Sequence, residues 1–174
     1  MPGKSPKEAA QNFIKFLKET LSCVTNQFLS AYPEGNVYKV YYEPYASLSD
    51  RYGNRFAISI TQIFRAVPDP KTNGEFKAKT DHYSYRLLRG PEEENEVLAY
   101  HWHPQESVVY PHLHVKELPK VHLPTSRVCL EDFVSLLMRD YKIRPRRSHA
   151  ECKEILERNK GAFEKMATWK IKTP

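Results

Sequence analysis

The sequence predicts an α+β fold: an N-terminal helix, an antiparallel meander sheet of about five strands, and two C-terminal helices. Three observations support this. Apolar residues recur at helical spacing near the N-terminus, β-rich strings separated by turn residues fill the middle, and helical spacing returns near the C-terminus. A length of 174 residues suits one domain of ordinary size, so residues 1–174 are expected to form a single α+β domain.

The first helix is expected over residues 6–31. Ser5-Pro6-Lys7-Glu8 has the residue types of a capping box, with proline at the first helical position. The turn-forming string at 33–36 then ends the pattern. Between these signals, one face of the helix carries an apolar stripe: Phe13, Leu17, Leu21, Val24 and Phe28.

The sheet is expected within residues 37–115, because short strings rich in β-branched and aromatic residues alternate there with turn signals. Asn73-Gly74 indicates a tight turn, and Gly90-Pro91 begins an exposed acidic turn. Residues 44–54 are interpreted as a polar connection. Consecutive strands joined by short turns favour antiparallel pairing. The five predicted strands cover 37–42, 55–67, 76–88, 97–103 and 108–115.

Two helices are expected within residues 129–166. Glu131 and Asp132 suit the first turn of one of them, and Thr125 or Ser126 is its expected cap. The string Arg144-Pro145-Arg146-Arg147 separates it from the last helix, which a second capping box opens at 148–151. The apolar stripe of the first of these helices consists of Leu130, Phe133, Leu136, Leu137 and Tyr141.

Composition narrows the classes of function. A net charge of +6 and a pI of about 9.1 favour polyanionic partners such as RNA, although ordinary basic proteins share these values. The sequence has no apolar run of membrane-spanning length and no signal-peptide pattern, so we expect a cytoplasmic protein without a membrane partner. The three cysteines are widely spaced, which favours free thiols over a disulfide framework.

Five of the seven histidines fall between positions 101 and 122. Four of them form two His-x-His motifs, His101-Trp102-His103 and His112-Leu113-His114. Residues two apart in a strand share a face, so each pair is expected to project from one side of the sheet. An antiparallel pairing would place His103 near His112 and His101 near His114. The sequence therefore predicts a patch of four imidazoles on the face opposite the core.

Such a patch suits acid–base chemistry, because imidazole titrates near neutrality and a pair can act as general base and general acid. RNA cleavage by its own 2′-hydroxyl group needs such a pair together with a cation near the phosphate. The candidate catalytic residues are His101, His103, His112 and His114. The candidate nucleic-acid contacts are Arg86, Arg127, Arg144, Arg146 and Arg147.

Two other interpretations of the patch stay open. The four imidazoles are also typical ligands of zinc and other divalent metals, which would make the protein a metal-dependent hydrolase. Asp81 and Glu106 lie nearby in sequence without a ligand-like spacing. Alternatively, strand histidines are simply polar residues of a solvated face. Acid–base chemistry needs no cofactor, so none is expected unless the histidines hold a metal.

Four short strings within residues 83–141 carry a resemblance to a known family: Tyr85-Arg86-Leu87, Val97-Leu98-Ala99-Tyr100, His112-Leu113-His114 and Leu130-Glu131-Asp132-Phe133. Through them, this segment resembles the TumE-like toxins of prokaryotic toxin–antitoxin loci, which are grouped with RelE-type ribonucleases. This resemblance implies a helix packed on an antiparallel sheet, an RNA-directed activity and an antitoxin-like protein partner. Where the family has an acidic Tyr-Asp-type motif, Tyr100 is followed here by His101-Trp102-His103.

From the sequence, we therefore expect an RNA-directed protein, a metal-independent endoribonuclease of toxin type, with His112 and His114 as acid and base. The alternatives are a non-catalytic module that binds nucleic acid or protein, and a metal-dependent hydrolase that uses the four histidines. Metal content separates the last of these from the other two.

Overall fold

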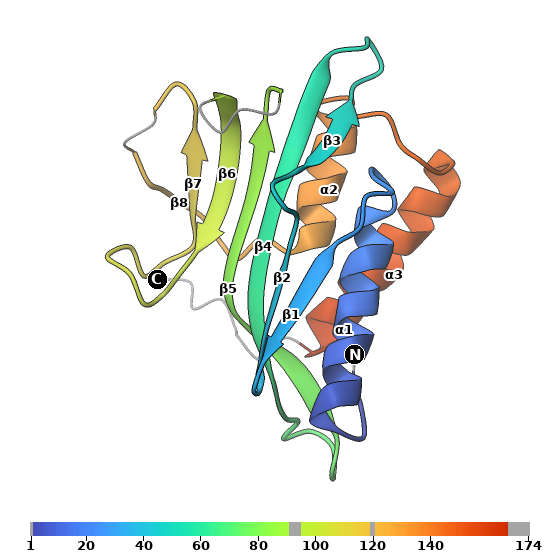
Figure 1. Ribbon diagram of the computed structural model, residues 1–174, viewed down its shortest axis with the longest axis vertical. Coiled ribbons are helices and arrows are strands. Elements are labelled where there is room, and N and C mark those ends of the chain that lie inside the picture. The colour runs from blue at the N-terminus through green and yellow to red at the C-terminus, as the bar shows by residue number, and fades with distance from the viewer. Residues whose placement is uncertain (1, 91–94, 119–120, 167–174) are drawn as a thin grey trace.

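Over the residues that the structure describes, the protein combines three helices with an eight-stranded antiparallel sheet (Figure 1). The computed structural model describes residues 2–90, 95–118 and 121–166. The predicted acidic turn at 91–94 lies outside these residues. In chain order, the elements are α1 (Pro6–Leu21), β1 (Ser30–Glu34), β2 (Val37–Tyr41), β3 (Ala46–Ser49), β4 (Arg55–Pro68), β5 (Phe76–Leu88), β6 (Glu96–Trp102), β7 (His112–Val115), β8 (Leu123–Pro124), α2 (Leu130–Arg139) and α3 (His149–Met166).

The sheet follows the order β1-β2-β4-β5-β6-β7-β8, and β3 pairs with part of β4. All pairings are antiparallel. Gly35 (φ 60°) and Gly74 (φ 80°) provide the left-handed backbone that two of the connections require. The predicted order of helix, antiparallel strands and two helices is confirmed, but the sheet has eight strands rather than about five.

The first helix is shorter than predicted: it ends at Leu21 instead of continuing to residue 31. Its start is confirmed, because the Ser5 hydroxyl accepts a hydrogen bond from the Glu8 N–H at 3.2 Å. β-branched residues and Asn26 follow Leu21 and disfavour helix. Phe28, predicted to be part of the apolar stripe, is 77% exposed, and the Lys18 ammonium lies over its ring.

Three strands were missed by the sequence prediction, and each has a local reason. β1 contains Pro33, which is tolerated because β1 is an edge strand. β3 lies inside the segment 44–54 interpreted as a polar connection; its buried residues Ala46 and Leu48 alternate with exposed serines. β8 has only two residues, too few for a periodic pattern.

The hydrophobic core lies between one face of the sheet and the helices, and all three helices contribute to it (Figure 1). The Phe13 ring meets the Phe64 ring edge-on at 4.8 Å. A short polar chain joins the helices inside this layer. The Asn159 amide donates to the Thr20 hydroxyl at 3.0 Å, and the Thr20 hydroxyl donates to the buried Glu131 carboxyl at 2.8 Å. The helices are thus tied to one another on one side of the sheet.

The last two helices lie where the sequence predicts them. The capping box at 148–151 is reciprocal, with the Ser148 N–H donating to Glu151 at 3.0 Å and the Glu151 N–H donating to Ser148 at 3.2 Å. The predicted cap of α2 is wrong: the N-cap is Cys129 rather than Thr125 or Ser126, and its side chain makes no capping hydrogen bond. Within the described part of the chain, no helix is long and apolar enough to cross a membrane. The three cysteines are free and buried.

Candidate metal centre on the histidine face

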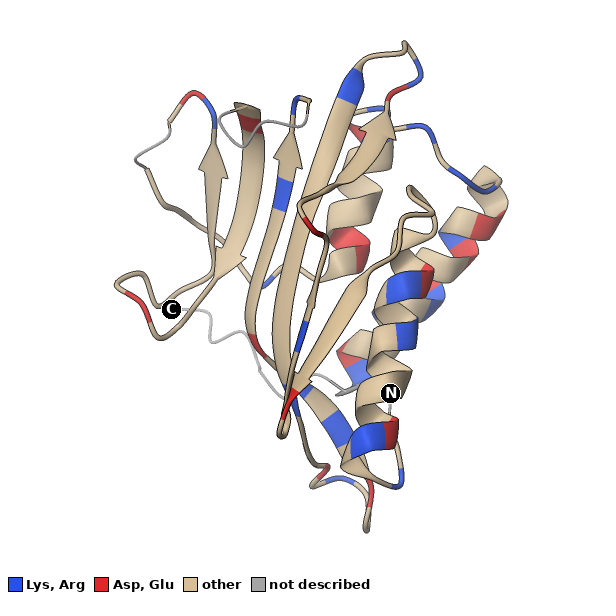
Figure 2. Cartoon of the chain, in the orientation of Figure 1, with Lys and Arg blue, Asp and Glu red and all other residues tan. Residues whose placement is uncertain are grey.

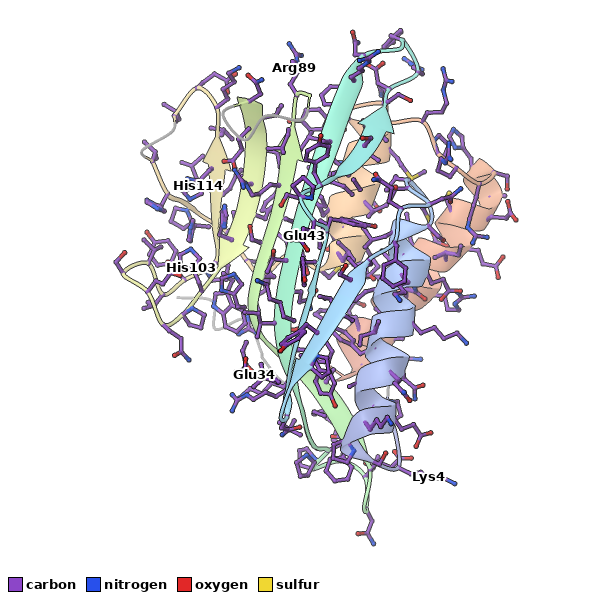
Figure 3. All side chains as sticks on the ribbon, in the orientation of Figure 1. Lys4, Glu34, Glu43, Arg89, His103 and His114 are labelled. Carbon is purple, nitrogen blue, oxygen red and sulfur yellow. The ribbon has the colours of Figure 1, made fainter. Side chains whose placement is uncertain are left out.

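Six of the seven histidines lie on the face of the sheet that turns away from the helices. Along β6, Leu98 and Trp102 are buried in the core, so the alternate residues His101 and His103 project to the other side. Figure 3 shows His103 and His114 near the β6–β7 edge, away from the helices. We call this surface the histidine face; it consists of His82, His101, His103, His112, His114 and His122, whose rings contact one another.

The four predicted histidines converge, in a register that is shifted by two residues from the one expected. His101 lies directly opposite His112, and His114 lies opposite Ala99. The diagonal neighbours are nevertheless close. The rings of His103 and His112 are 5.0 Å apart between centroids, and so are those of His101 and His114. Diagonal contact of this kind is within reach of long or aromatic side chains on adjacent strands.

His122 completes a group that can hold a metal ion. One ligand atom from each of His112, His114 and His122 can be chosen so that all three lie within 4.8 Å of one another. Zinc–nitrogen bonds of 2.0–2.1 Å in tetrahedral geometry require nitrogens about 3.3 Å apart, so small side-chain rotations bring the three together. No other such group of histidine, cysteine or carboxylate ligands occurs among the described residues.

His112 has the hydrogen bonding expected of a metal ligand. It is fully buried, and its Nδ1 lies 3.0 Å from the Tyr110 carbonyl oxygen. A carbonyl only accepts, so Nδ1 must carry the proton and Nε2 must present a lone pair. That Nε2 atom is buried and has no hydrogen-bond partner among the described residues. A buried, unsatisfied acceptor is costly, and a metal ion would satisfy it.

The environment favours the neutral form of four of these imidazoles, those of His82, His101, His112 and His114. Burial lowers the pKa of His101 to about 3, with further lowering by the neighbouring His114 and His112. Burial also lowers the pKa of His112, His114 and His82, and other histidines add to each of these shifts. Neutral imidazole is the form that binds metal, whereas a general acid must be protonated. The electrostatics therefore favour metal ligation over proton donation.

The metal-free protein is expected to lose about 2 kcal/mol of unfolding free energy between pH 7.5 and pH 5 through His101 alone. The folded pKa lies near 3, below the unfolded value of about 6.5, so the unfolded state binds more protons in this window. Stability is therefore complete above pH 6.5 and is lost as the pH falls toward 3. His82, His112 and His114 act in the same direction.

Urea unfolding in EDTA at the two pH values measures this loss. His101→Gln removes the titrating ring, so the variant should show a pH-dependent loss smaller by about 2 kcal/mol. An unchanged pH dependence in the variant would show that His101 is readily protonated in the folded state.

Two charged side chains lie beside the histidines. The His103 Nδ1 is 3.2 Å from a Glu106 carboxylate oxygen, which places a carboxylate beside an imidazole. Arg86 forms an ion pair with Glu96 at 2.6 Å, and its charge contributes to the lowered pKa of His101. Asp81, the other acidic residue noted in the sequence, instead pairs with Arg65 at 2.7 Å.

The remaining predicted nucleic-acid contacts lie elsewhere in the fold. Arg127 stacks on Trp102, with its guanidinium carbon 3.2 Å from the ring centroid, on the helix side of the sheet. The other three arginines occupy the connection between α2 and α3, visible as blue segments in Figure 2. That connection contacts β3 and the turn after α1, through Arg144 N–H to the Ser49 carbonyl and Arg146 N–H to the Cys23 carbonyl. Of the predicted arginines, only Arg86 joins the histidines.

His122 is the site residue that the sequence interpretation missed. No strand pattern surrounds His122, so the sequence does not place it beside the two His-x-His motifs. The useful signal was the spacing of eight residues from His114, which allows a short hairpin return. β7 and β8 pair Leu113 with Leu123, and this register extended by one residue places His122 opposite His114. Their rings are 4.6 Å apart between centroids.

Comparison of the chain with models of known protein families, with curated proteins and with solved structures gives no match. The site itself must therefore carry the functional argument.

Proposed function

We propose that the protein is a metal-dependent hydrolase whose metal ion is held by His112, His114 and His122. The observation that carries this proposal is the buried Nε2 of His112, which has no hydrogen-bond partner among the described residues. The Tyr110 carbonyl fixes the tautomer of this ring, and two further imidazoles lie beside it. Three protein ligands leave a coordination position open, as in catalytic zinc sites, whereas structural sites use four. A metal bound there would acidify a coordinated water.

The neighbouring side chains supply the other functions that hydrolysis needs. His103 lies beside His112, and its Nδ1 lies 3.2 Å from a Glu106 carboxylate oxygen. An imidazole next to a carboxylate in this way suits a general base that accepts the proton of the attacking water. Arg86 lies on the same face near His101, but its charge is matched by Glu96 at 2.6 Å. Attraction of an anionic substrate would therefore come from the metal ion that the histidines would hold. A phosphodiester is such a substrate, so RNA stays the proposed substrate class.

Metal analysis of the untagged protein, followed by a hydrolysis assay, tests the proposal. We expect about one equivalent of a divalent transition metal, and hydrolysis of bis(p-nitrophenyl) phosphate or RNA that EDTA abolishes and added metal restores. Metal binding without turnover of either substrate would leave a metal-binding protein and contradict the hydrolase.

A second candidate is the metal-independent endoribonuclease predicted from the sequence, with His112 and His114 as acid and base. The convergence of four histidines supports it, but the lowered pKa values of both residues oppose the acid role. RNA cleavage that persists in EDTA, in protein free of metal, would favour this candidate over the hydrolase.

A further inference from the structure

A pocket of about 830 Å³ lies between the turn that follows α1, the strand β3 and the connection between α2 and α3. Three arginines line it, Arg55, Arg144 and Arg146, together with small polar side chains such as Ser47 and Ser49. Figure 1 shows the α2–α3 connection at the right of the molecule and β7 and β8 at the left edge of the sheet. The pocket is therefore separate from the histidine face.

The backbone holds the three arginines around Ser49. Arg55 lies directly opposite Ser49 in the pairing of β3 with β4, and the Arg144 N–H donates to the Ser49 carbonyl at 2.8 Å. The Arg146 N–H donates to the Cys23 carbonyl at 2.8 Å, which fixes the same connection to the turn after α1. These bonds come from the main chain, so they leave the guanidinium groups available to a ligand.

The charges of these arginines have no partner in the protein. The side chains of Arg55, Arg144 and Arg146 are exposed, and they make no hydrogen bond or ion pair with any residue that the structure describes. Within the same part of the chain, no aspartate or glutamate lines the pocket. The lining thus carries three positive charges and no negative one.

Three carboxylates lie within four residues of the lining along the chain, and they leave this charge in place. Asp50 is buried, and its carboxylate accepts three hydrogen bonds from residues 52–54. Asp140 forms an ion pair with a neighbouring arginine outside the lining. Glu43 precedes the start of β3, whereas Ser49 is at its end. The same stretches contain three further basic residues: Arg51, Lys142 and Arg147.

This combination favours a compact anion with several charges. A pocket lined by charge of one sign focuses the electrostatic potential and attracts the opposite charge. Guanidinium groups bind phosphate oxygens through two parallel hydrogen bonds, which makes phosphate a better match than a spherical anion. None of the lining residues is aromatic, so the pocket offers no ring on which a nucleobase can stack.

We propose that this pocket binds a compact polyphosphate group, which either inorganic triphosphate or the phosphate chain of a nucleotide provides. The guanidinium groups of Arg55, Arg144 and Arg146 donate to the phosphate oxygens, and the hydroxyl groups of Ser47 and Ser49 supply neutral donors. Binding at this pocket depends neither on a metal ion at the histidine face nor on hydrolysis there.

Calorimetric titration of the full chain with inorganic triphosphate, ATP and adenosine tests this inference. We expect a dissociation constant in the micromolar range for triphosphate and no binding of adenosine. Because the lining has no aromatic ring, the dissociation constant of ATP should lie within about tenfold of that of triphosphate. Tighter binding of ATP would also support the proposal and would identify a nucleotide as the source of the phosphate chain.

Variants locate the binding. Arg55→Gln and Arg146→Gln should each weaken triphosphate binding by about tenfold or more, the effect of losing a hydrogen bond between charged groups. Arg55→Lys should retain part of the affinity. Arg65→Gln is the matched control, because it removes the same charge from the same strand at a distance of roughly 30 Å. It should change the affinity by less than about twofold, since salt screens charges at that distance.

His122→Ala separates this pocket from the histidine face, where a bound metal ion would also attract phosphate. We expect this variant to bind triphosphate as the unchanged protein does.

Four results would overturn the proposal. These are no binding of triphosphate or ATP, unchanged affinity in both glutamine variants of the lining, loss of triphosphate binding in His122→Ala, and a short single-stranded RNA that binds more tightly than triphosphate and is weakened by Arg55→Gln. The last result would assign the arginines to a nucleic-acid strand. Circular dichroism and thermal unfolding establish that each variant is folded.

Discussion

His122→Ala is expected to weaken metal binding by about 10²–10⁴-fold. Apparent binding free energies of structural zinc sites are about 10–16 kcal/mol, so the loss of one ligand in three removes roughly 3–5 kcal/mol. His122 is the only member of the ligand group that comes from outside β7, and no strand hydrogen bond depends on its side chain. The substitution should therefore remove metal and metal-dependent hydrolysis while the protein stays folded.

A competition titration against a chromogenic zinc chelator measures this effect, with circular dichroism as the test of folding. Two controls bracket it. His82→Ala removes a ring of the histidine face outside the ligand group, and His149→Ala removes a surface histidine at the start of α3. Each of these substitutions should lower the metal affinity by no more than about tenfold, which is the smallest loss typical of residues that surround metal ligands without binding the ion. Unchanged affinity in His122→Ala would show that the three-histidine group is not the metal site.

Phe133→Ala is expected to lower the unfolding free energy by about 3–5 kcal/mol, a large share of a typical domain's stability. Phe133 is fully buried on α2, and its ring lies 5.7 Å from that of Tyr85 and 6.3 Å from that of Tyr100. Truncation leaves a cavity at the contact between α2 and the centre of the sheet, where the surrounding aromatic rings cannot collapse fully.

Urea unfolding at neutral pH measures the loss, and Phe28→Ala is the matched control. The Phe28 ring is 77% exposed and contacts the Lys18 ammonium, so its truncation should cost at most about 1 kcal/mol. If Phe133→Ala cost no more than Phe28→Ala, α2 would not be part of the cooperative core.

The fold was predictable where the periodic pattern was long. The strands β4 and β5 have 14 and 13 residues, and their alternation gave nearly their full bounds. The pattern failed at short or edge elements. In β1, Pro33 reads as a terminator, yet an edge strand needs no hydrogen bond at that position. At the end of α1, Val24 continues the helical spacing but is buried in a turn instead.

The sequence predicts which face of the sheet carries the histidines, but it does not predict which of them form the ligand group. Alternation with Leu98 and Trp102 placed His101 and His103 opposite the core without any knowledge of the partner strand. Register depends on the connection of residues 103–111, which has no turn signature, so the pairing of His101 with His112 was not available from sequence. The position of Arg127 depended on the path after β8, which no local pattern describes.

The two-residue strand β8 has a kinetic consequence for any ion bound at the histidine face. β8 forms the edge of the sheet and pairs with β7 at only two positions, whereas the core lies under the central strands. Edge segments of this kind open locally at a small fraction of the global unfolding free energy. Such fraying would move His122 away from His112 and His114 without disturbing the helices. The residence time of a bound ion would then follow the opening rate of this edge, so that loading and release need no global unfolding.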